Sequence, residues 1–419
     1  MSYTEEYKQY VAAATCSHQA VLAQKELLKQ AGFKELKENA KWNLGAGGAY
    51  YVIRNGSALI AFRLPKKKAD HALIIATHAD APAFKIKNTP DMKMENAYVK
   101  WNVEGYGGAI LSTWFDRPLS VAGRVFVKNA GRVTEKAVDF ARDLCMINSL
   151  AIHMDRDTNK GHEWSIQKEL LPLVSNDAKV TLASLLAKEL RIKESSILSA
   201  DLYLYNRQEA TVWGGENEFF SAPRLDDTAC AYASLRSLID ASASKSLAMH
   251  VMFDHEEVGS SSMQGASSTF LKDTLHRIAL SLKMDEEEEL CFLSESFLLS
   301  ADNGHALHPN YPEKCDVTNR PVMGRGVLLK FAGNQKYTTD AYSAAKVRLL
   351  AERAGVPLQD YHNRSDIPGG STLGNLSVHQ LGIHSADIGI AQLAMHSAYE
   401  TCACSDLADL YKLFQCYFA

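Results

Sequence analysis

The chain has 419 residues, of which 46% are hydrophobic and 22% charged, so its composition is that of a globular protein with two or three domains. Its 45 basic and 49 acidic residues give a formal net charge of −4, which leaves no basic surplus for nucleic acid or an anionic membrane surface. Because no stretch of about 20 apolar residues and no signal-like N-terminus is evident, we expect a cytoplasmic protein without a membrane partner.

The N-terminal part of the sequence alternates between helical and strand-like patterns. Residues 17–31 have helical spacing, with Ser17 as a candidate N-cap, and we expect this helix to open the fold. Asn55 and Gly56 separate two β-rich runs and predict a hairpin. The apolar residues 71–78 predict a strand that ends in His78.

The character of the sequence changes between about residues 88 and 222. Short β-like runs such as 120–128, several glycines and a helical segment at 180–190 favour a separate unit. We therefore predict a catalytic domain formed by residues 1–88 and 223–419, with residues 89–222 inserted as a second, β-rich domain.

After Asp226 the helix and strand patterns alternate again. We expect helices at 228–241 and 340–355, strands at 247–253, 327–333 and 385–391, and a closing helix from about Glu400. This alternation is typical of an α/β sheet flanked by helices.

Polar side chains follow several of the predicted strands. His78 and Asp80 are two residues apart, so they point to the same side, and Asp80 could fix the orientation of a metal-bound His78 directly or through a short relay. Glu256 and Glu257 are adjacent and point in different directions, so one can bind a metal while the other accepts a proton.

Ligands in open α/β sheets gather at the carboxyl ends of the strands, so we expect these residues to meet. The candidate metal ligands are His78, Asp226, Glu257, Asp302 and His396. Five ligands exceed the needs of one tetrahedral zinc and suit two divalent ions that share a carboxylate, which indicates a two-metal hydrolase. Taken singly, Asp302 could instead form a turn and His396 could be a hydrogen-bonded core histidine.

Eight sequence blocks resemble, in order, those of the aspartyl aminopeptidase and aminopeptidase I family of co-catalytic zinc metallopeptidases. They are THADAP (77–82), GYGGAILSTWFDRPLSVAGRV (105–125), SLAIHM (149–154), SAPRLDD (221–227), FDHEEVGSSSMQGA (253–266), SADNGHALHPNY (300–311), NQKYTTDA (334–341) and QLAMHS (392–397). The resemblance runs nearly from end to end, and it implies a zinc-exopeptidase-like α/β catalytic domain with a mixed sheet and an inserted dimerisation domain.

The resemblance also implies roles for individual residues. One metal would be held by His78, Asp226 and Asp302, and a second by Asp226, Glu257 and His396. Glu256 would be the general base, and His153 would reach a neighbouring subunit's site to stabilise the tetrahedral intermediate. With Asp80, these two residues complete the candidate catalytic set. The ions are expected to be zinc, although cobalt and manganese suit the same ligands.

The expected activity is removal of one N-terminal residue from peptides by a homo-oligomer, implied to be a tetrahedral dodecamer built from dimers. Ala79 and Ala81 replace hydroxyl or polar neighbours that acid-preferring members often carry, so acidic and broad specificity both stay open. Lys336 is a candidate cation for an acidic substrate side chain, or else a solvent-facing lysine. Two alternatives remain: a related two-zinc amidohydrolase, such as a deacetylase or carboxypeptidase, and a non-catalytic self-assembling protein.

Overall fold

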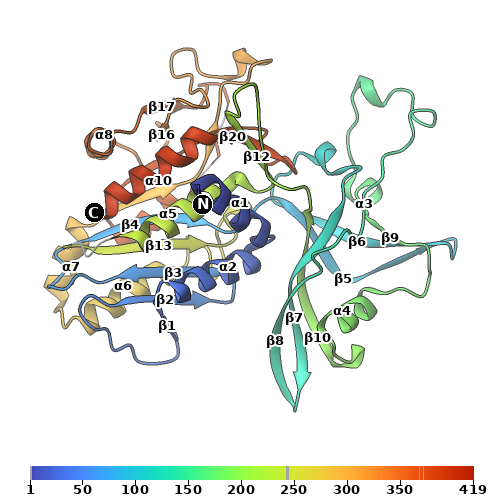
Figure 1. Ribbon diagram of the computed structural model, residues 1–419, viewed down its shortest axis with the longest axis horizontal. Helices are drawn as coiled ribbons and strands as arrows, with labels where there is room; N and C mark the ends of the chain where they lie inside the picture. The colour runs from blue at the N-terminus through green and yellow to red at the C-terminus, as the bar shows by residue number, and fades with distance from the viewer. Residues whose placement is uncertain (1, 242–244, 368, 371) are drawn as a thin grey trace.

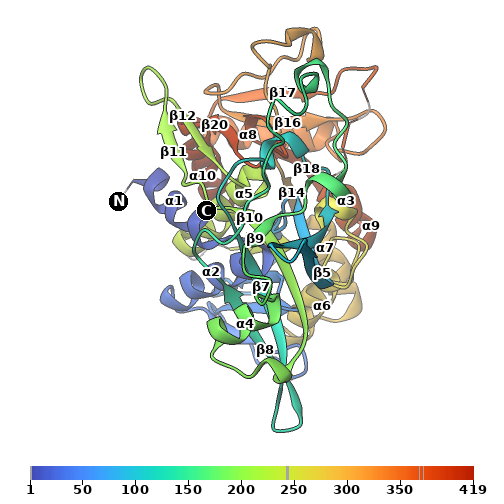
Figure 2. The ribbon, with the colours of Figure 1, turned by 90° about the vertical axis from the view of Figure 1, so that its right-hand side faces the viewer.

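The computed structural model describes residues 2–241, 245–367, 369–370 and 372–419. It consists of a broad body built around a nine-stranded sheet and a β-rich region that projects from one side of it (Figure 1). Figure 2 views the molecule from the side of the projecting region. No helix in the described part of the chain is long and apolar enough to cross a membrane.

The nine-stranded sheet is mixed. In spatial order its strands are β1 (Lys34–Leu36), β2 (Ala49–Arg54), β3 (Ala58–Arg63), β13 (Leu247–Phe253), β4 (Ala72–His78), β14 (Phe297–Ala301), β18 (His384–Gly389), β16 (Val327–Phe331) and β17 (Leu358–His362). Strands β13, β4, β14 and β18 are mutually parallel, whereas β3 and β16 run antiparallel to their neighbours in this group. The predicted hairpin at Asn55 and Gly56 is confirmed as the connection between β2 and β3.

Helices cover both faces of this sheet because its central strands are apolar on both sides. In β4, Ile75 packs with α1 (Tyr3–Ala13), α2 (Ser17–Gln30), α5 (Leu225–Asp240), α8 (Ala341–Ala354) and α10 (Cys404–Phe418). Its neighbour Ile74 joins the opposite core with α6 (Phe270–Ser281), α7 (Glu286–Glu295) and α9 (Leu373–Leu381). The predicted α/β class, a mixed sheet flanked by helices, is confirmed.

The projecting region has its own sheet and core. Its strands are, in order, β8 (Arg132–Asp139), β7 (Leu119–Asn129), β10 (Ile197–Asn206), β5 (Ala83–Met94), β6 (Tyr98–Tyr106) and β9 (Leu173–Ser175). Side chains such as Trp101 and Val121 form a separate hydrophobic core, to which α3 (Ile166–Glu169) and α4 (Leu182–Leu190) contribute. The strands of this sheet fall within residues 83–206.

A third sheet of five strands connects distant parts of the chain. It comprises β11 (Thr211–Trp213), β12 (Phe219–Ala222), β20 (Glu400–Ala403), β19 (Ala391–Leu393) and β15 (Gly304–His305). Here β12 pairs with β20, so the chain just before Asp226 lies against the chain just after His396.

Three expectations about element boundaries were wrong. Helix α1 precedes the segment that we expected to open the fold. Cys16, not Ser17, has the extended N-cap conformation of α2 and makes no side-chain capping bond, so burial of the helix rather than capping fixes this end. Residues Glu400–Ala403 form strand β20 because they pair with β12 and β19, and the closing helix begins only at Cys404.

Candidate active site and metal centre

Three parallel strands carry site residues to one edge of the nine-stranded sheet. His78 ends β4 and lies beside Phe253, the last residue of β13. Glu256 and Glu257 follow β13 in a single turn of 3₁₀ helix, and Asp302 follows the end of β14. Polar groups that would be costly inside the sheet therefore converge where its strands end.

Asp226 lies between the two histidines. It sits in the first turn of α5, where its backbone departs from helical angles. One carboxylate oxygen is 3.3 Å from His78 Nε2 and the other is 3.4 Å from His396 Nε2. The His396 ring nitrogen is also 3.3 Å from Glu257 Oε2, so a single aspartate joins two clusters of potential ligands.

The candidate ligands fall into two groups whose ligand atoms lie within 4.8 Å of one another. The first contains His78, Asp226, Asp227 and Asp302, and the second contains Asp226, Glu257 and His396. All five residues expected to bind metal are thus brought together, and Asp227 is added. His153 is not brought to this site, because it lies in the exposed segment 149–154.

Hydrogen bonds on the far side of each ring orient the histidines. His78 Nδ1 lies 3.1 Å from the Asp80 carbonyl oxygen, and His396 Nδ1 lies 3.0 Å from the carbonyl oxygen of Gly108. A ring that donates from Nδ1 carries an unprotonated Nε2 when it is neutral. In both residues the nitrogen that faces Asp226 is therefore suited to bind a cation.

Asp80 lies behind this cluster and fixes the turn that carries the two glutamates. One of its carboxylate oxygens accepts the backbone N–H of Glu256 at 3.1 Å, and the other accepts that of Glu257 at 3.1 Å. The hydroxyl of Tyr106 donates to the second oxygen at 2.7 Å. Asp80 also lies 3.4 Å from His78 Nδ1 through its carboxylate, so it contacts both the turn and the ring.

Negative charge accumulates in the site. Burial raises the pKa of Glu256 to about 8, with Asp302 and Asp80 adding to the shift. Burial likewise raises the pKa of Asp302 to about 6, despite the opposing charge of Lys330. For His396, burial alone would lower the pKa, but the carboxylates of Asp226 and Glu257 raise it to about 10. Neighbouring carboxylates therefore raise the pKa values of the carboxyl groups and of His396 alike, because the site holds more carboxylates than its cations can balance.

The carboxylate oxygens that lack hydrogen bonds show whether divalent metal ions would fit this site. Asp227 Oδ1 and Glu257 Oε1 are buried and accept no hydrogen bond, and Asp226 Oδ1 is buried with no hydrogen bond apart from its 3.3 Å contact with His78 Nε2. Leaving such acceptors without a partner costs about 1–3 kcal/mol each, and more when they are charged. Histidine nitrogens with open carboxylate oxygens are the ligands that zinc binds in hydrolases, so the donor set fits divalent metal.

A cleft of about 580 Å³ opens in front of these residues. Lys330 lines it as a buried cation whose Nζ donates to the carbonyl oxygens of Asp302 and Asn303, both at 3.0 Å. Lys336, the cation we had considered from the sequence, donates instead to the carbonyl oxygen of Gly369 and does not line this cleft. An isolated lysine inside the apolar run VLLKF was the sequence signal for Lys330.

Comparison with known proteins places these observations in a family. Residues 10–418 match the model of the family described as aminopeptidase I zinc metalloprotease (M18). A probable M18 family aminopeptidase 2 of Clostridium novyi is 42% identical over 99% of this chain and 98% of its own length. The protein of the same description from Stutzerimonas stutzeri is 37% identical, over 98% of this chain and 96% of its own.

Solved structures are similar over almost the whole chain. Ape4, in its complex with Nbr1, is 34% identical, with a TM-score of 0.94 over 99% of this chain and 85% of its own. The mApe1 dodecamer of S. cerevisiae is 28% identical, with a TM-score of 0.87 over 99% of this chain and 95% of its own. The similarity therefore includes both the nine-stranded sheet and the projecting region.

Proposed function

The chain belongs to the aminopeptidase I zinc metalloprotease (M18) family, and from that premise we propose how its residues cleave peptides and which peptides they prefer. The family resemblance and the aminopeptidase activity expected from the sequence are confirmed. The observation that carries the proposal is the position of Asp226, whose two oxygens face His78 and His396 separately. A shared aspartate is the arrangement expected of a site for two ions.

We assign the ligands accordingly. His78, Asp226 and Asp302 would hold one ion, and Asp226, Glu257 and His396 would hold the other, as the family resemblance implied. The unpaired oxygens on Asp226 and Glu257 support this assignment. Asp227 also belongs to the first group of potential ligands. Its Oδ2 accepts the backbone N–H of His78 at 3.3 Å, so we assign it a supporting role behind His78.

Glu256 is the proposed proton acceptor because it lines the cleft yet belongs to neither ligand group. When bound, the two ions would polarise the substrate carbonyl and lower the pKa of the attacking water. Glu256 takes a proton from this water as the water oxygen adds to the carbonyl carbon. It then delivers that proton to the peptide nitrogen as the C–N bond breaks. Asp80 holds the Glu256 backbone in place for both transfers.

Charge in the cleft supports a preference for acidic N-terminal residues. Lys330 provides a buried cation at the cleft wall. A neighbouring pocket of about 500 Å³, which shares His305, Tyr361 and Gly370 with the cleft, is lined by the cations Lys314 and Arg364. Arg364 Nε lies 2.6 Å from Asp366 Oδ1, and burial lowers the pKa of His305, so Lys314 is the cation of this pocket on which the proposal rests. The pocket's acidic residue, Asp316, is engaged by the backbone N–H groups of Thr318 and Asn319. Lys314 in this pocket and Lys330 in the cleft, whose Nζ also lies 3.6 Å from Asp302 Oδ2, are the cations proposed to attract an aspartyl or glutamyl side chain.

We further propose that the region 89–222 mediates self-association and that the assembly is a dodecamer, as in the S. cerevisiae structure. Large apolar side chains surround His153 at the surface: Leu150, Ile152 and Met154 are 61%, 45% and 75% exposed. Such a cluster is suited to burial against another subunit. In that contact His153 would donate to the oxyanion of the tetrahedral intermediate in the neighbour's site.

The test is hydrolysis of aminoacyl reporters with acidic, apolar and basic residues, together with an N-acetylated control, in the presence of zinc. We expect release from free-amine substrates, fastest for the acidic ones, and loss of activity with a chelator. The variant Lys330→Met should reduce the acidic preference relative to apolar substrates. Cleavage of the acetylated control alone would support the amidohydrolase alternative, and equal rates for acidic and basic residues would contradict the proposed specificity.

A further inference from the structure

Glu400 is a buried carboxylate that belongs to neither group of candidate ligands. It begins β20, is 2% exposed, and pairs with Ala222 across the five-stranded sheet. Its Oε1 accepts the backbone N–H of His396 at 2.6 Å, and its Oε2 accepts that of Asp226 at 3.1 Å. One side chain therefore joins the backbones of the two residues whose side chains meet in the second ligand group.

The position is costly for a carboxylate. Among the described residues Glu400 has no ion-pair partner within 4.0 Å, so the two backbone N–H groups are its main support. Burying a charged group without an ion pair is unfavourable unless hydrogen bonds compensate. Packing alone would be served better by an apolar side chain, which indicates that the two hydrogen bonds themselves matter.

The local backbone shows what these bonds hold. His396 has a φ of 66°, in the left-handed region that non-glycine residues rarely adopt, and Arg224, two residues before Asp226, has a φ of 58°. Such conformations persist when surrounding contacts fix them. Glu400 supplies one contact to each segment, although Asp226 and Glu400 are 174 positions apart in the sequence.

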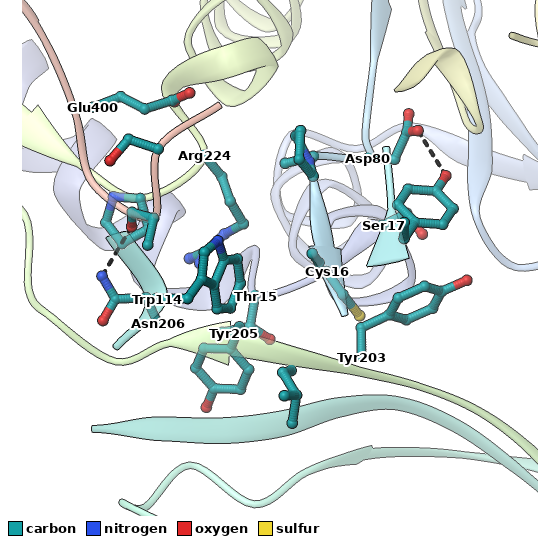
Figure 3. A pocket seen from close by; sticks show the side chains of 18 of the residues that line it. Thr15, Cys16, Ser17, Asp80, Trp114, Tyr203, Tyr205, Asn206, Arg224 and Glu400 are labelled. Atoms are coloured by element: carbon teal, nitrogen blue, oxygen red, sulfur yellow. Dashed lines mark hydrogen bonds between the residues drawn. The ribbon is translucent and has the colours of Figure 1, made fainter. Parts of the chain in front are cut away.

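Asp80 provides a parallel on the other side of the same site. It accepts the backbone N–H groups of Glu256 and Glu257, as Glu400 accepts those of Asp226 and His396. Figure 3 shows that Asp80 and Glu400 are both among the side chains that line one pocket, together with Arg224 and Trp114. The two carboxylates thus hold the backbones of the four residues, and neither carboxylate lines the substrate cleft.

We propose that Glu400 is a positioning residue that sets the spacing between Asp226 and His396 and thereby the affinity for a divalent ion held by Asp226, Glu257 and His396. This inference rests on the proposed ligand assignment. It differs from a general stabilising role because the bonded N–H groups belong to the ligands themselves.

Asp406 offers a matched control within the same chain. It is also buried, and its two carboxylate oxygens accept the backbone N–H groups of Gly324 and Gly326 at 2.7 and 2.9 Å. None of these residues belongs to either ligand group. Asp406→Asn should therefore disturb a comparable buried pair of hydrogen bonds without changing metal affinity.

The experiment is zinc titration of the metal-free full-length chain against a competing chromogenic chelator, for the wild type, Glu400→Gln, Glu400→Asp and Asp406→Asn. Glutamine keeps the shape but replaces one acceptor oxygen with an NH₂ group that cannot accept the second N–H. We expect zinc affinity at the position held by Asp226, Glu257 and His396 to fall about 10- to 100-fold in Glu400→Gln. The zinc affinity of Glu400→Asp, which keeps both oxygens on a shorter side chain, should fall less, and that of Asp406→Asn should match the wild type. Urea unfolding of each variant, monitored by circular dichroism, corrects for any loss of folded protein.

A folded Glu400→Gln variant with wild-type zinc affinity would overturn the inference, and so would an equal loss of affinity in Asp406→Asn. If Glu400→Gln does not fold, Glu400→Asp decides, because wild-type affinity in that variant would contradict the positioning role. If the wild type itself binds no zinc, the ligand assignment fails first and the inference falls with it. Recovery of Glu400→Gln turnover at high zinc concentration would support the proposal further.

Discussion

The interior of the nine-stranded sheet and its carboxyl edge differ in how their buried ionisable groups are paired, although both are reached along strand β13. In the interior, His250 has a partner at each ring nitrogen: Ser234 Oγ at 2.8 Å and Gln24 Oε1 at 2.9 Å. At the edge, a few residues further along the chain, Glu257 has a buried oxygen without any partner. Among the described residues, the buried carboxylate oxygens left unpaired in this way belong to Asp226, Asp227 and Glu257.

This difference separates what folding requires from what function requires. Folding favours complete pairing of buried polar groups, because each unpaired group lowers the free energy of unfolding. The edge retains several unpaired carboxylates that only a cation would satisfy. Substitutions at the edge should therefore change metal binding and turnover, whereas substitutions in the interior should change stability.

The largest effect is expected for Asp226→Asn, because this residue is shared by both ligand groups. The variant should lose metal at both positions and its activity should fall to background. Asp302→Asn, which alters only the first group, should keep metal at the second. Metal content per chain after dialysis, measured by elemental analysis, checks the difference. Equal metal retention in the two variants would contradict a shared role for Asp226.

Glu256→Gln should affect chemistry alone. The Glu256 side chain is in neither ligand group, so metal content and fold should stay unchanged, while kcat falls by about 10²- to 10⁴-fold through loss of the proton acceptor. Steady-state kinetics with saturating zinc measure this, and Glu287→Gln on the exposed start of α7 is the control. A near-normal rate would remove Glu256 from the proton-transfer role.

A smaller effect, about 10²-fold on kcat, is expected for His153→Ala, since one donor to a developing oxyanion would be lost. The oligomer should stay intact by size-exclusion chromatography. Because His153 would act in a neighbouring subunit, mixing this variant with Glu256→Gln under subunit exchange should restore part of the activity. If no mixture regains activity, the cross-subunit role is wrong.

Sequence patterns predicted the residues that directly follow strands. His78, Glu257 and Asp302 could be recognised because each lies at or within a few residues of the end of an apolar run, and strand ends meet at one edge of a parallel sheet. The family resemblance then extended these expectations to the whole chain. The hairpin at Asn55 and Gly56 and the α/β alternation were accessible from local patterns, whereas the mixed sheet was implied by the family resemblance.

Residues that depend on long-range pairing could not be predicted. Glu400 was assigned to a helix because the pairing of β20 with β12 joins segments about 180 residues apart. Lys330 was overlooked because a lysine in a strand normally faces solvent, and only the position of Asp302 explains its burial. His153 is harder still, since the proposed role requires a second copy of the chain.

The smallest expected effect belongs to the interior and concerns pH. Burial lowers the pKa of His250 to about 3, well below the ordinary value of 6.5 for histidine. The unfolded chain therefore binds a proton here below about pH 6.5, whereas the folded chain stays neutral until about pH 3. Stability that is present above pH 6.5 is lost as the pH falls through this window, by about 1.4 kcal/mol per pH unit.

His250→Gln tests this contribution, because glutamine can hydrogen-bond but does not titrate. The variant should be less stable than the wild type at pH 7.5, since its fit between Ser234 and Gln24 is poorer. Its free energy of unfolding should nevertheless fall less steeply between pH 6 and pH 4, so that the two curves converge. His379→Gln, at an exposed position on α9, should follow the wild-type slope. Urea unfolding at several pH values measures all three. Parallel curves for the wild type and His250→Gln would mean that His250 is not held neutral by the core, and the contrast between the interior and the edge would then lose its main support.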